Sequence, residues 1–139
     1  MVDPEIHQGG CLCGAVRYEV TGPLDVVNYC HCTQCQKSTG HFYASSMPTT
    51  GELRLLASET LKWYRSSSFA ERGFCSTCGS QLFWRRVGGA GFSFVVGSLD
   101  GDPKLAGGHH IFVEAKKSYY SINDGLPQHA GFPKGDSPD

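Results

Sequence analysis

The sequence is poor in charge and has no long hydrophobic run. Acidic and basic residues make up 18% of its 139 residues, and the formal net charge is −1. We therefore expect no nucleic-acid partner, which would need a basic surface. No membrane partner is expected either, because no apolar segment approaches the roughly 18 residues that cross a bilayer. The opening segment, MVDPEIHQGG, lacks the basic start and apolar centre of a secretory signal. These absences predict a cytoplasmic protein.

Segments suited to long helices are also scarce, because 18 glycines and 7 prolines interrupt the chain. Short stretches with alternating apolar residues lie between these breaks and predict strands. The expected strands are 15–20, 25–29, 42–46, 53–57, 60–65, 81–86, 92–96 and 110–114. One short helix is expected after Cys32, with Thr33 as N-cap and Gln36 completing a capping box. Gly40 would end it.

The length favours one domain over residues 1–139, with a mainly β core at about 9–133. The stretch 129–139 is rich in glycine, proline and aspartate. We expect it to be loosely held, with 134–139 forming a flexible tail.

Cysteine is the most informative residue type. Seven is an odd number, so disulfide pairing would leave one thiol over, and a reducing cytoplasm disfavours disulfides. The cysteines form two pairs and a central triplet: Cys11 and Cys13; Cys30, Cys32 and Cys35; Cys75 and Cys78. Thiolates favour zinc over calcium or magnesium. Two pairs would make a closed site of four thiolates, and three cysteines would leave a fourth position open, as in catalytic zinc sites.

Several alternatives stay open on spacing alone. Spacing does not determine which blocks combine in the closed site. A histidine could also complete a second, inert site, and the candidates are His31, His41, His109 and His110. A redox role for a C-x-x-C pair is disfavoured, because the βαβ pattern that accompanies it is absent. Cysteines of iron–sulfur clusters usually come as a denser run.

Five segments carry a specific resemblance to a known family. They are GGCLCGAVRYEV, NYCHCTQCQKSTG, RGFCSTCGSQLFW, VVGSLD and HHIFVEAKKSYYSINDGLPQ. In order and spacing they resemble the glutathione-dependent formaldehyde-activating enzymes, a family that also includes the centromere protein V group. The resemblance runs from about residue 9 to 133.

The resemblance implies a β-tent fold of short antiparallel strands with two Zn²⁺ ions per chain. By the family pattern, the structural zinc is held by Cys11, Cys13, Cys75 and Cys78. The second zinc is held by Cys30, Cys32 and Cys35, which are therefore the expected catalytic residues. The implied reaction is that of a carbon–sulfur lyase, in which formaldehyde and the thiol glutathione give S-hydroxymethylglutathione.

An incoming thiol would then be the fourth ligand of the second zinc and be held as thiolate. Lys37, two residues beyond the triplet, could attract a carboxylate of a peptide-like thiol, and His31 and His41 could transfer protons. The alternative from another class is a non-catalytic, zinc-stapled binding module. The sequence leaves the true substrate and the oligomeric state open.

Overall fold

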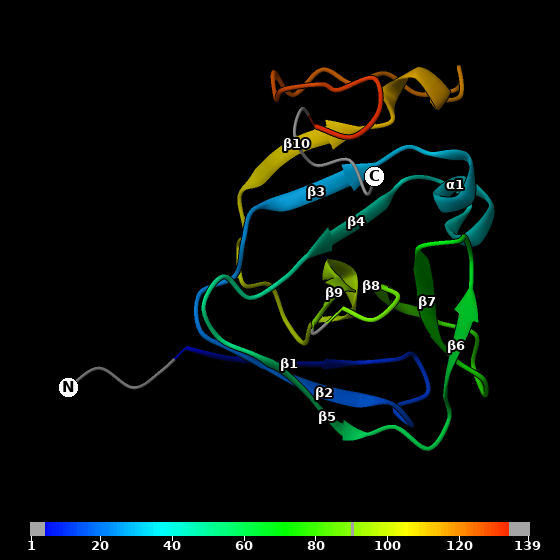
Figure 1. Cartoon of the computed structure of the whole chain (residues 1–139). Helices are drawn as coiled ribbons and strands as arrows, with labels where there is room; N and C mark the ends of the chain where they lie inside the picture. Colours follow the sequence, from blue (N-terminus) through cyan, green and yellow to red (C-terminus); the bar gives the residue numbers. More distant parts are fainter. Residues whose placement is uncertain (1–4, 90, 134–139) are drawn as a thin grey trace.

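The computed structural model describes residues 5–89 and 91–133. The described residues form ten strands, one α-helix and two short 3₁₀ segments, arranged as two sheets. The mainly β class and the single α-helix expected from the sequence are confirmed. Figure 1 shows the smaller sheet below the larger one, with α1 at one end of the molecule.

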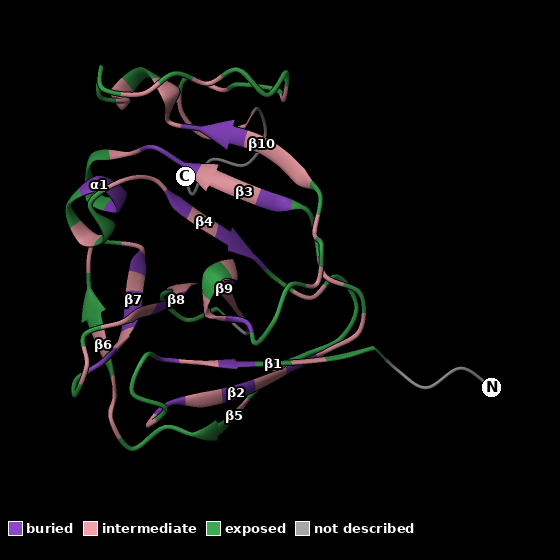
Figure 2. Cartoon of the chain, turned by 180° about the vertical axis from the view of Figure 1, so that it is seen from behind, coloured by how far each residue is buried: buried purple, intermediate pink, exposed green. Residues whose placement is uncertain are grey.

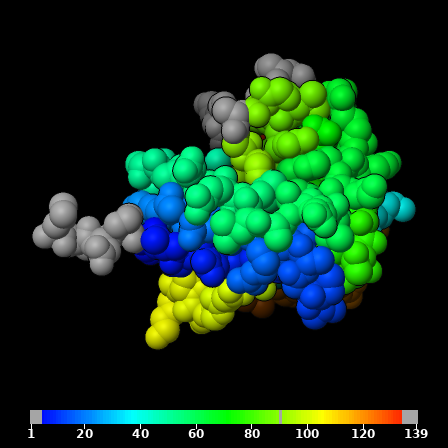
Figure 3. All heavy atoms as spheres, turned by 90° about the horizontal axis from the view of Figure 1, so that it is seen from below, coloured from blue at the N-terminus to red at the C-terminus, as the bar shows by residue number. Residues whose placement is uncertain are grey.

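The smaller sheet has three strands in the order β1-β2-β5. β1 (Ile6–Gly10) pairs antiparallel with β2 (Arg17–Thr21), and β2 pairs antiparallel with β5 (Leu53–Ala57). The side seen from below in Figure 3 presents this part of the chain, with the N-terminal strands in blue.

The larger sheet has seven strands in the order β10-β3-β4-β9-β8-β7-β6. Its members are β3 (Val27–Cys30), β4 (Tyr43–Ser46), β6 (Leu61–Arg65), β7 (Ala70–Cys75), β8 (Gln81–Arg86), β9 (Phe92–Val95) and β10 (Gly107–Ile111). All pairs in it are antiparallel except β3 with β10, which are parallel. The expectation of antiparallel strands is therefore wrong for this pair. Parallel strands need a long connection, and the chain between β3 and β10 is long enough to bring β10 back to the edge in the same direction as β3.

The main core contains apolar side chains of β2, β8 and β9, together with Leu99. Tyr18 and Phe83 are fully buried, and their rings meet edge to face at 5.2 Å. Gly9 of β1 leaves room for this packing, since a Cβ there would lie 2.6 Å from the Tyr18 hydroxyl and 2.5 Å from the Ser98 carbonyl oxygen. Figure 2 shows buried residues along β4 and β7, whereas β5 is largely exposed.

The expected strands at 53–57 and 81–86 match β5 and β8, and those at 15–20, 25–29, 42–46, 60–65 and 92–96 overlap observed strands with ends shifted by one or two residues. Two strands, β1 and β7, were not expected. The strand expected at 110–114 is observed earlier, as β10. It ends at Ile111 because Phe112 has a φ of 55°, in the left-handed region, and the 3₁₀ segment η2 (Val113–Ala115) follows.

The helix α1 (Thr33–Thr39) lies where the sequence predicted it, but its N-cap is Cys32 rather than Thr33. The Cys32 sulfur accepts a hydrogen bond from the backbone N–H of Cys35, so a thiol has the role expected of the Thr33 hydroxyl. Gln36 makes no capping box. Its side-chain amide instead donates to the carbonyl oxygens of His31 and Ala115, both at 2.7 Å. Gly40 ends the helix as expected, with a φ of 87°.

Residues 129–133 are held in place, contrary to the expectation of a loose stretch. The backbone N–H of His129 donates to the carbonyl oxygen of His110, and that of Phe112 donates to Gly131. The expected flexible tail, 134–139, lies outside the described residues. Across 5–89 and 91–133, no helix has the length and apolar character needed to cross a membrane.

Candidate metal centres

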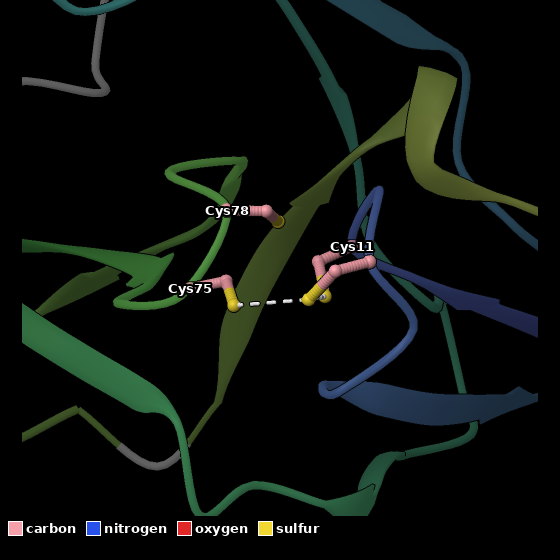
Figure 4. A group of neighbouring side chains, drawn as sticks. Cys11, Cys75 and Cys78 are labelled. Atoms are coloured by element: carbon pink, nitrogen blue, oxygen red, sulfur yellow. Dashed lines mark hydrogen bonds between the residues drawn. The ribbon is translucent and has the colours of Figure 1, made fainter.

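Four cysteines from distant parts of the chain meet between the two sheets. Cys11 and Cys13 lie just after β1, whereas Cys75 ends β7 and Cys78 lies in the turn before β8. Their sulfur atoms all lie within 4.8 Å of one another, and Figure 4 shows those of Cys11, Cys75 and Cys78 gathered around one point. Spacing left the pairing open, and the fold brings the first and last pairs together.

The sulfur separations fit a tetrahedral metal. Cys11 and Cys13 are 3.6 Å apart at sulfur, and Cys13 and Cys75 are 3.8 Å apart. Zn–S bonds of about 2.3 Å place the sulfurs of a tetrahedron about 3.8 Å apart. Gly14 and Gly79, one residue after each pair, have φ values of 82° and 80°, which glycine adopts without strain. The residues present therefore fit a closed zinc site.

Polar groups surround these sulfurs. The backbone N–H of Val16 donates to the Cys11 sulfur at 3.2 Å, and the Thr60 hydroxyl lies 3.3 Å from the Cys75 sulfur. The Ser80 hydroxyl lies 3.2 Å from the Cys78 sulfur and also accepts from the backbone N–H of Leu12. Such donors stabilise thiolates and link the two loops directly. Thr60 and Ser80 had no distinguishing signal in the sequence.

The central triplet forms a second group at the junction of β3 and α1. Cys30 ends β3, Cys32 caps the helix and Cys35 lies in its first turn, so a strand end and a helix start fix all three. Their sulfurs lie within 4.8 Å of one another, and among the described residues no histidine belongs to this group. Three sulfur donors on one side fit a soft or borderline metal such as zinc and leave room for a further ligand.

Two of the four histidines suggested as a fourth ligand, His31 and His110, are engaged elsewhere, whereas His109 lines the cavity beside the triplet without belonging to the group of ligand atoms. His31 Nδ1 lies 2.5 Å from the Tyr120 hydroxyl, and His31 Nε2 lies 2.8 Å from His110 Nδ1. His110 Nε2 is in turn 2.8 Å from a carboxylate oxygen of Asp124. Both ring nitrogens of both histidines thus have partners within one chain of hydrogen bonds, which runs from the buried histidines to the exposed Asp124.

Burial and the nearby His110 lower the pKa of His31 to about 4, so its ring is neutral near pH 7. The pKa of Asp124 is lowered, first by the backbone N–H of Leu126 and then by His110. His41, the other expected proton-transfer residue, lies 3.4 Å from the Tyr119 hydroxyl. No motif in the sequence indicated the His110–Asp124 pair, since its partners are 14 residues apart.

A cavity of about 970 Å³ opens beside the central triplet. All three cysteines line it, together with aromatic residues, such as Trp84 and Phe112, that pack against the triplet. Arg72 of β7 also lines it, and its Nη2 donates to the Cys35 sulfur at 3.4 Å. This arginine was not predicted as a site residue. Lys37, the cation suggested from its place after the triplet, lines a separate pocket of about 340 Å³ with Lys117 and Tyr119.

The Arg72 guanidinium and the Cys35 sulfur are electrostatically complementary. Burial alone would lower the pKa of Arg72, but the charge of a Cys35 thiolate and its hydrogen bond raise it. Arg72 therefore stays cationic and offsets part of the negative charge that three thiolates would bring to one site.

These two cysteine groups lie within a recognisable family pattern. The family model described as glutathione-dependent formaldehyde-activating enzyme matches residues 6–115. The chain belongs to this family. The match includes both cysteine groups and Arg72 and ends shortly before Tyr120 and Asp124.

Two curated proteins of related sequence support the assignment. An uncharacterized lyase of Schizosaccharomyces pombe is 30% identical over 93 residues, and the match covers 64% of this chain and 64% of that relative. The chain thus spans a little under two thirds of that relative's own length. A protein of Halomonas elongata, provisionally named a glutathione-dependent formaldehyde-activating enzyme, is 28% identical over 128 residues, covering 83% of this chain and 80% of the relative.

A solved structure shares the fold. The crystal structure of a Rhodobacter sphaeroides protein superposes with a TM-score of 0.52 and 21% identity, covering 88% of this chain and 98% of that one. At this identity the similarity supports the arrangement of strands and says nothing of activity.

Proposed function

We propose that this family member is a zinc-dependent carbon–sulfur lyase that acts on the thiol adduct of a small aldehyde. The proposed reaction joins glutathione and formaldehyde to give S-hydroxymethylglutathione. One observation carries the proposal: in a chain of this family, three cysteines line a large cavity, and the described residues add no fourth histidine, cysteine or carboxylate ligand to their group. A cavity of about 300–1,000 Å³ is typical of small-molecule sites.

The proposal assigns two Zn²⁺ ions to the chain. Cys11, Cys13, Cys75 and Cys78 would hold the structural ion, and Cys30, Cys32 and Cys35 the ion at the cavity. Bound at the triplet, zinc would lower the pKa of a thiol and so supply a thiolate near neutral pH.

The chain's own residues bind and orient the reactants. In the reaction the thiol sulfur forms a bond to the formaldehyde carbon, the carbonyl electron pair moves to oxygen, and the thiol proton ends on that oxygen. Trp84 and Phe112, packed against the triplet, would restrict water there. His31 is held between Tyr120 and His110 and would keep the backbone between Cys30 and Cys32 in one conformation.

We also propose that residues 1–139 work as one domain in the cytoplasm. None of the seven cysteines forms a disulfide, and cysteines stay out of disulfides in a reducing compartment.

The first test measures zinc per chain by elemental analysis, before and after mild chelation. We expect two zinc ions, of which one is removed while the circular dichroism spectrum of the fold is retained. The protein is then mixed with ¹³C-formaldehyde and glutathione, and adduct formation and breakdown are followed by NMR exchange. The expected result is exchange faster than the uncatalysed background, lost on chelation and restored by added zinc.

The Cys32→Ser variant is the matched control, because the closed cluster is untouched. We expect it to hold one zinc and show only background exchange. Full exchange activity in a Cys32→Ser protein that had lost its second zinc would refute the proposal. Two zinc ions that resist chelation, with no exchange, would favour the non-catalytic binding module instead.

A further inference from the structure

Arg72 is a buried cation with unused hydrogen-bond donors. Its side chain lies in the sheet interior with 7% of its surface exposed. One nitrogen, Nη2, donates to the Cys35 sulfur, but Nε and Nη1 have no partner among the described residues. The Tyr43 ring faces the guanidinium at 5.4 Å, and the buried Tyr43 hydroxyl also has no partner. Burying unpaired charged donors is costly, so these atoms point to a ligand.

The unpaired donors belong to the cavity at the central triplet. Arg72 and Tyr43 both line it, as does Asn28, whose buried side-chain oxygen has no hydrogen-bond partner within residues 5–89 and 91–133. The other two arginines of the cavity differ from Arg72. Arg85 is paired with Glu71 and stacks over Trp63 at 3.7 Å, and Arg86 is exposed. Arg72 is therefore the cation of this cavity that combines burial with free donors.

We propose that Arg72 binds a carboxylate of the thiol substrate and so selects anionic thiols at the triplet. This inference rests on the proposed function, because it places the thiol in the same cavity. A carboxylate suits the position better than a neutral hydroxyl, since a buried guanidinium is best satisfied by a full negative charge. Arg72 donates to the Cys35 sulfur, so a carboxylate bound to Arg72 would lie near the triplet. In the substrate, only a few covalent bonds would therefore separate this carboxylate from the reacting thiol sulfur.

The test compares two thiols with the same three-carbon chain, 3-mercaptopropionate and its methyl ester, of which only the first carries a negative charge. Their dissociation constants are measured by calorimetry with zinc-loaded protein and no aldehyde. The wild-type protein is compared with the Arg72→Gln, Arg72→Lys and Arg86→Gln variants, each assayed for zinc per chain. The quantity of interest is the ratio of the ester constant to the acid constant, because it cancels differences in thiol affinity common to both ligands.

We expect Arg72→Gln to lower this ratio by about 10- to 100-fold, the effect of charge-assisted hydrogen bonds to a carboxylate. Arg72→Lys should retain part of the preference, and Arg86→Gln, an exposed arginine of the same cavity, should retain all of it. An unchanged ratio in Arg72→Gln overturns the inference. Equal binding of the acid and the ester by the wild-type protein also overturns the inference. This measurement does not depend on the folding of any variant.

The outcome is separable from the proposed reaction. A preference for the acid that depends on Arg72, with no formaldehyde exchange, supports the inference and refutes the proposed reaction. Formaldehyde exchange with equal binding of acid and ester supports the proposed reaction and refutes the inference about Arg72.

Discussion

Tyr18 is a single buried residue on which both sheets depend. Its ring packs on Phe83 and Phe94 of the larger sheet, and its hydroxyl lies 2.5 Å from the Ser98 hydroxyl. Gly9 on the neighbouring strand provides the space for that hydroxyl. Because the phenol is fully buried, its ionised form is disfavoured, and the pKa of Tyr18 is raised to about 12.

The raised pKa predicts a specific loss of stability at alkaline pH. Above pH 10 an unfolded chain releases the Tyr18 proton, at its ordinary pKa of about 10, while the folded chain keeps it. The contribution of the neutral Tyr18 phenol to the free energy of unfolding is therefore fully present below pH 10 and is lost as the pH rises toward 12. By pH 11 the free energy of unfolding should fall by about 1 kcal/mol from this residue alone. Urea unfolding between pH 8 and pH 11 measures it.

The Tyr18→Phe variant supplies the comparison. It should be less stable than wild type at pH 8 by about 1 kcal/mol, for the lost hydrogen bond, yet lose less stability between pH 8 and pH 11. Tyr64→Phe, at a tyrosine with 65% of its surface exposed, should decline like wild type. If the free energy of unfolding fell equally between pH 8 and pH 11 in Tyr18→Phe and in wild type, the ionisation of Tyr18 would not contribute to the loss of stability.

At single positions, the sequence predicted those site residues whose type and spacing are typical of metal ligands. The seven cysteines were identified, and the fold brings them together as four and three. Arg72 was missed because its importance depends on contact with Cys35, 37 positions away, and on burial that β7 alone does not reveal. Lys37 was suggested only because it lies close to the triplet in sequence, and the structure places it at a different pocket.

At the level of elements, strands with several apolar or aromatic residues were predictable and those with few were not. β5 and β8 match their expected ranges, whereas β1, with the sequence IHQGG, has no apolar alternation. β7 contains Gly73, where a Cβ would lie 3.1 Å from the Trp63 ring and 3.2 Å from Phe83. Glycine weakens a strand prediction, but here it allows two aromatic rings to pack closely across the sheet.

The segment after η2 is held to β10 by backbone and side-chain bonds. The N–H of His110 donates to the Pro127 carbonyl oxygen, and the N–H of His129 donates to that of His110. Asp124 adds two contacts, one to the His110 ring at 2.8 Å and one from the backbone N–H of Leu126 at 3.0 Å. This carboxylate therefore joins the segment to the buried histidines.

Replacing Asp124 with alanine should loosen this segment without unfolding the sheets. Loss of charge-assisted hydrogen bonds, partly screened by solvent, predicts amide exchange about three- to tenfold faster over residues 126–131. Exchange in β7 and β8 should stay the same. Hydrogen–deuterium exchange with mass spectrometry measures both regions in one experiment.

Asp102→Ala is the matched control for this change. Asp102 also accepts a backbone hydrogen bond two residues ahead, from Lys104, but contacts no histidine in the structure described. It should leave residues 126–131 unchanged. Uniformly faster exchange in Asp124→Ala, including β7 and β8, would contradict a local role.

At the scale of the whole molecule, the two cysteine groups differ in what they connect. The four-cysteine cluster joins the loop after β1, in the smaller sheet, to the turn between β7 and β8, in the larger one. The central triplet lies within six consecutive residues and connects only β3 with α1. A metal in the first cluster therefore closes a long chain segment, whereas a metal in the second closes almost none.

This difference predicts that two single serine substitutions have the same effect on zinc content but different effects on the melting temperature. Cys78→Ser and Cys32→Ser should each lower the zinc content from two ions to one. Losing the metal that joins the sheets should lower the melting temperature of Cys78→Ser by roughly 10–20 °C. Cys32→Ser should melt within about 3 °C of wild type, because its group spans only a local segment. Elemental analysis and thermal unfolding by circular dichroism measure both quantities. A fall in Cys32→Ser as large as in Cys78→Ser would mean that the triplet also holds the fold together, and the assignment of separate structural and substrate-binding roles would then be wrong.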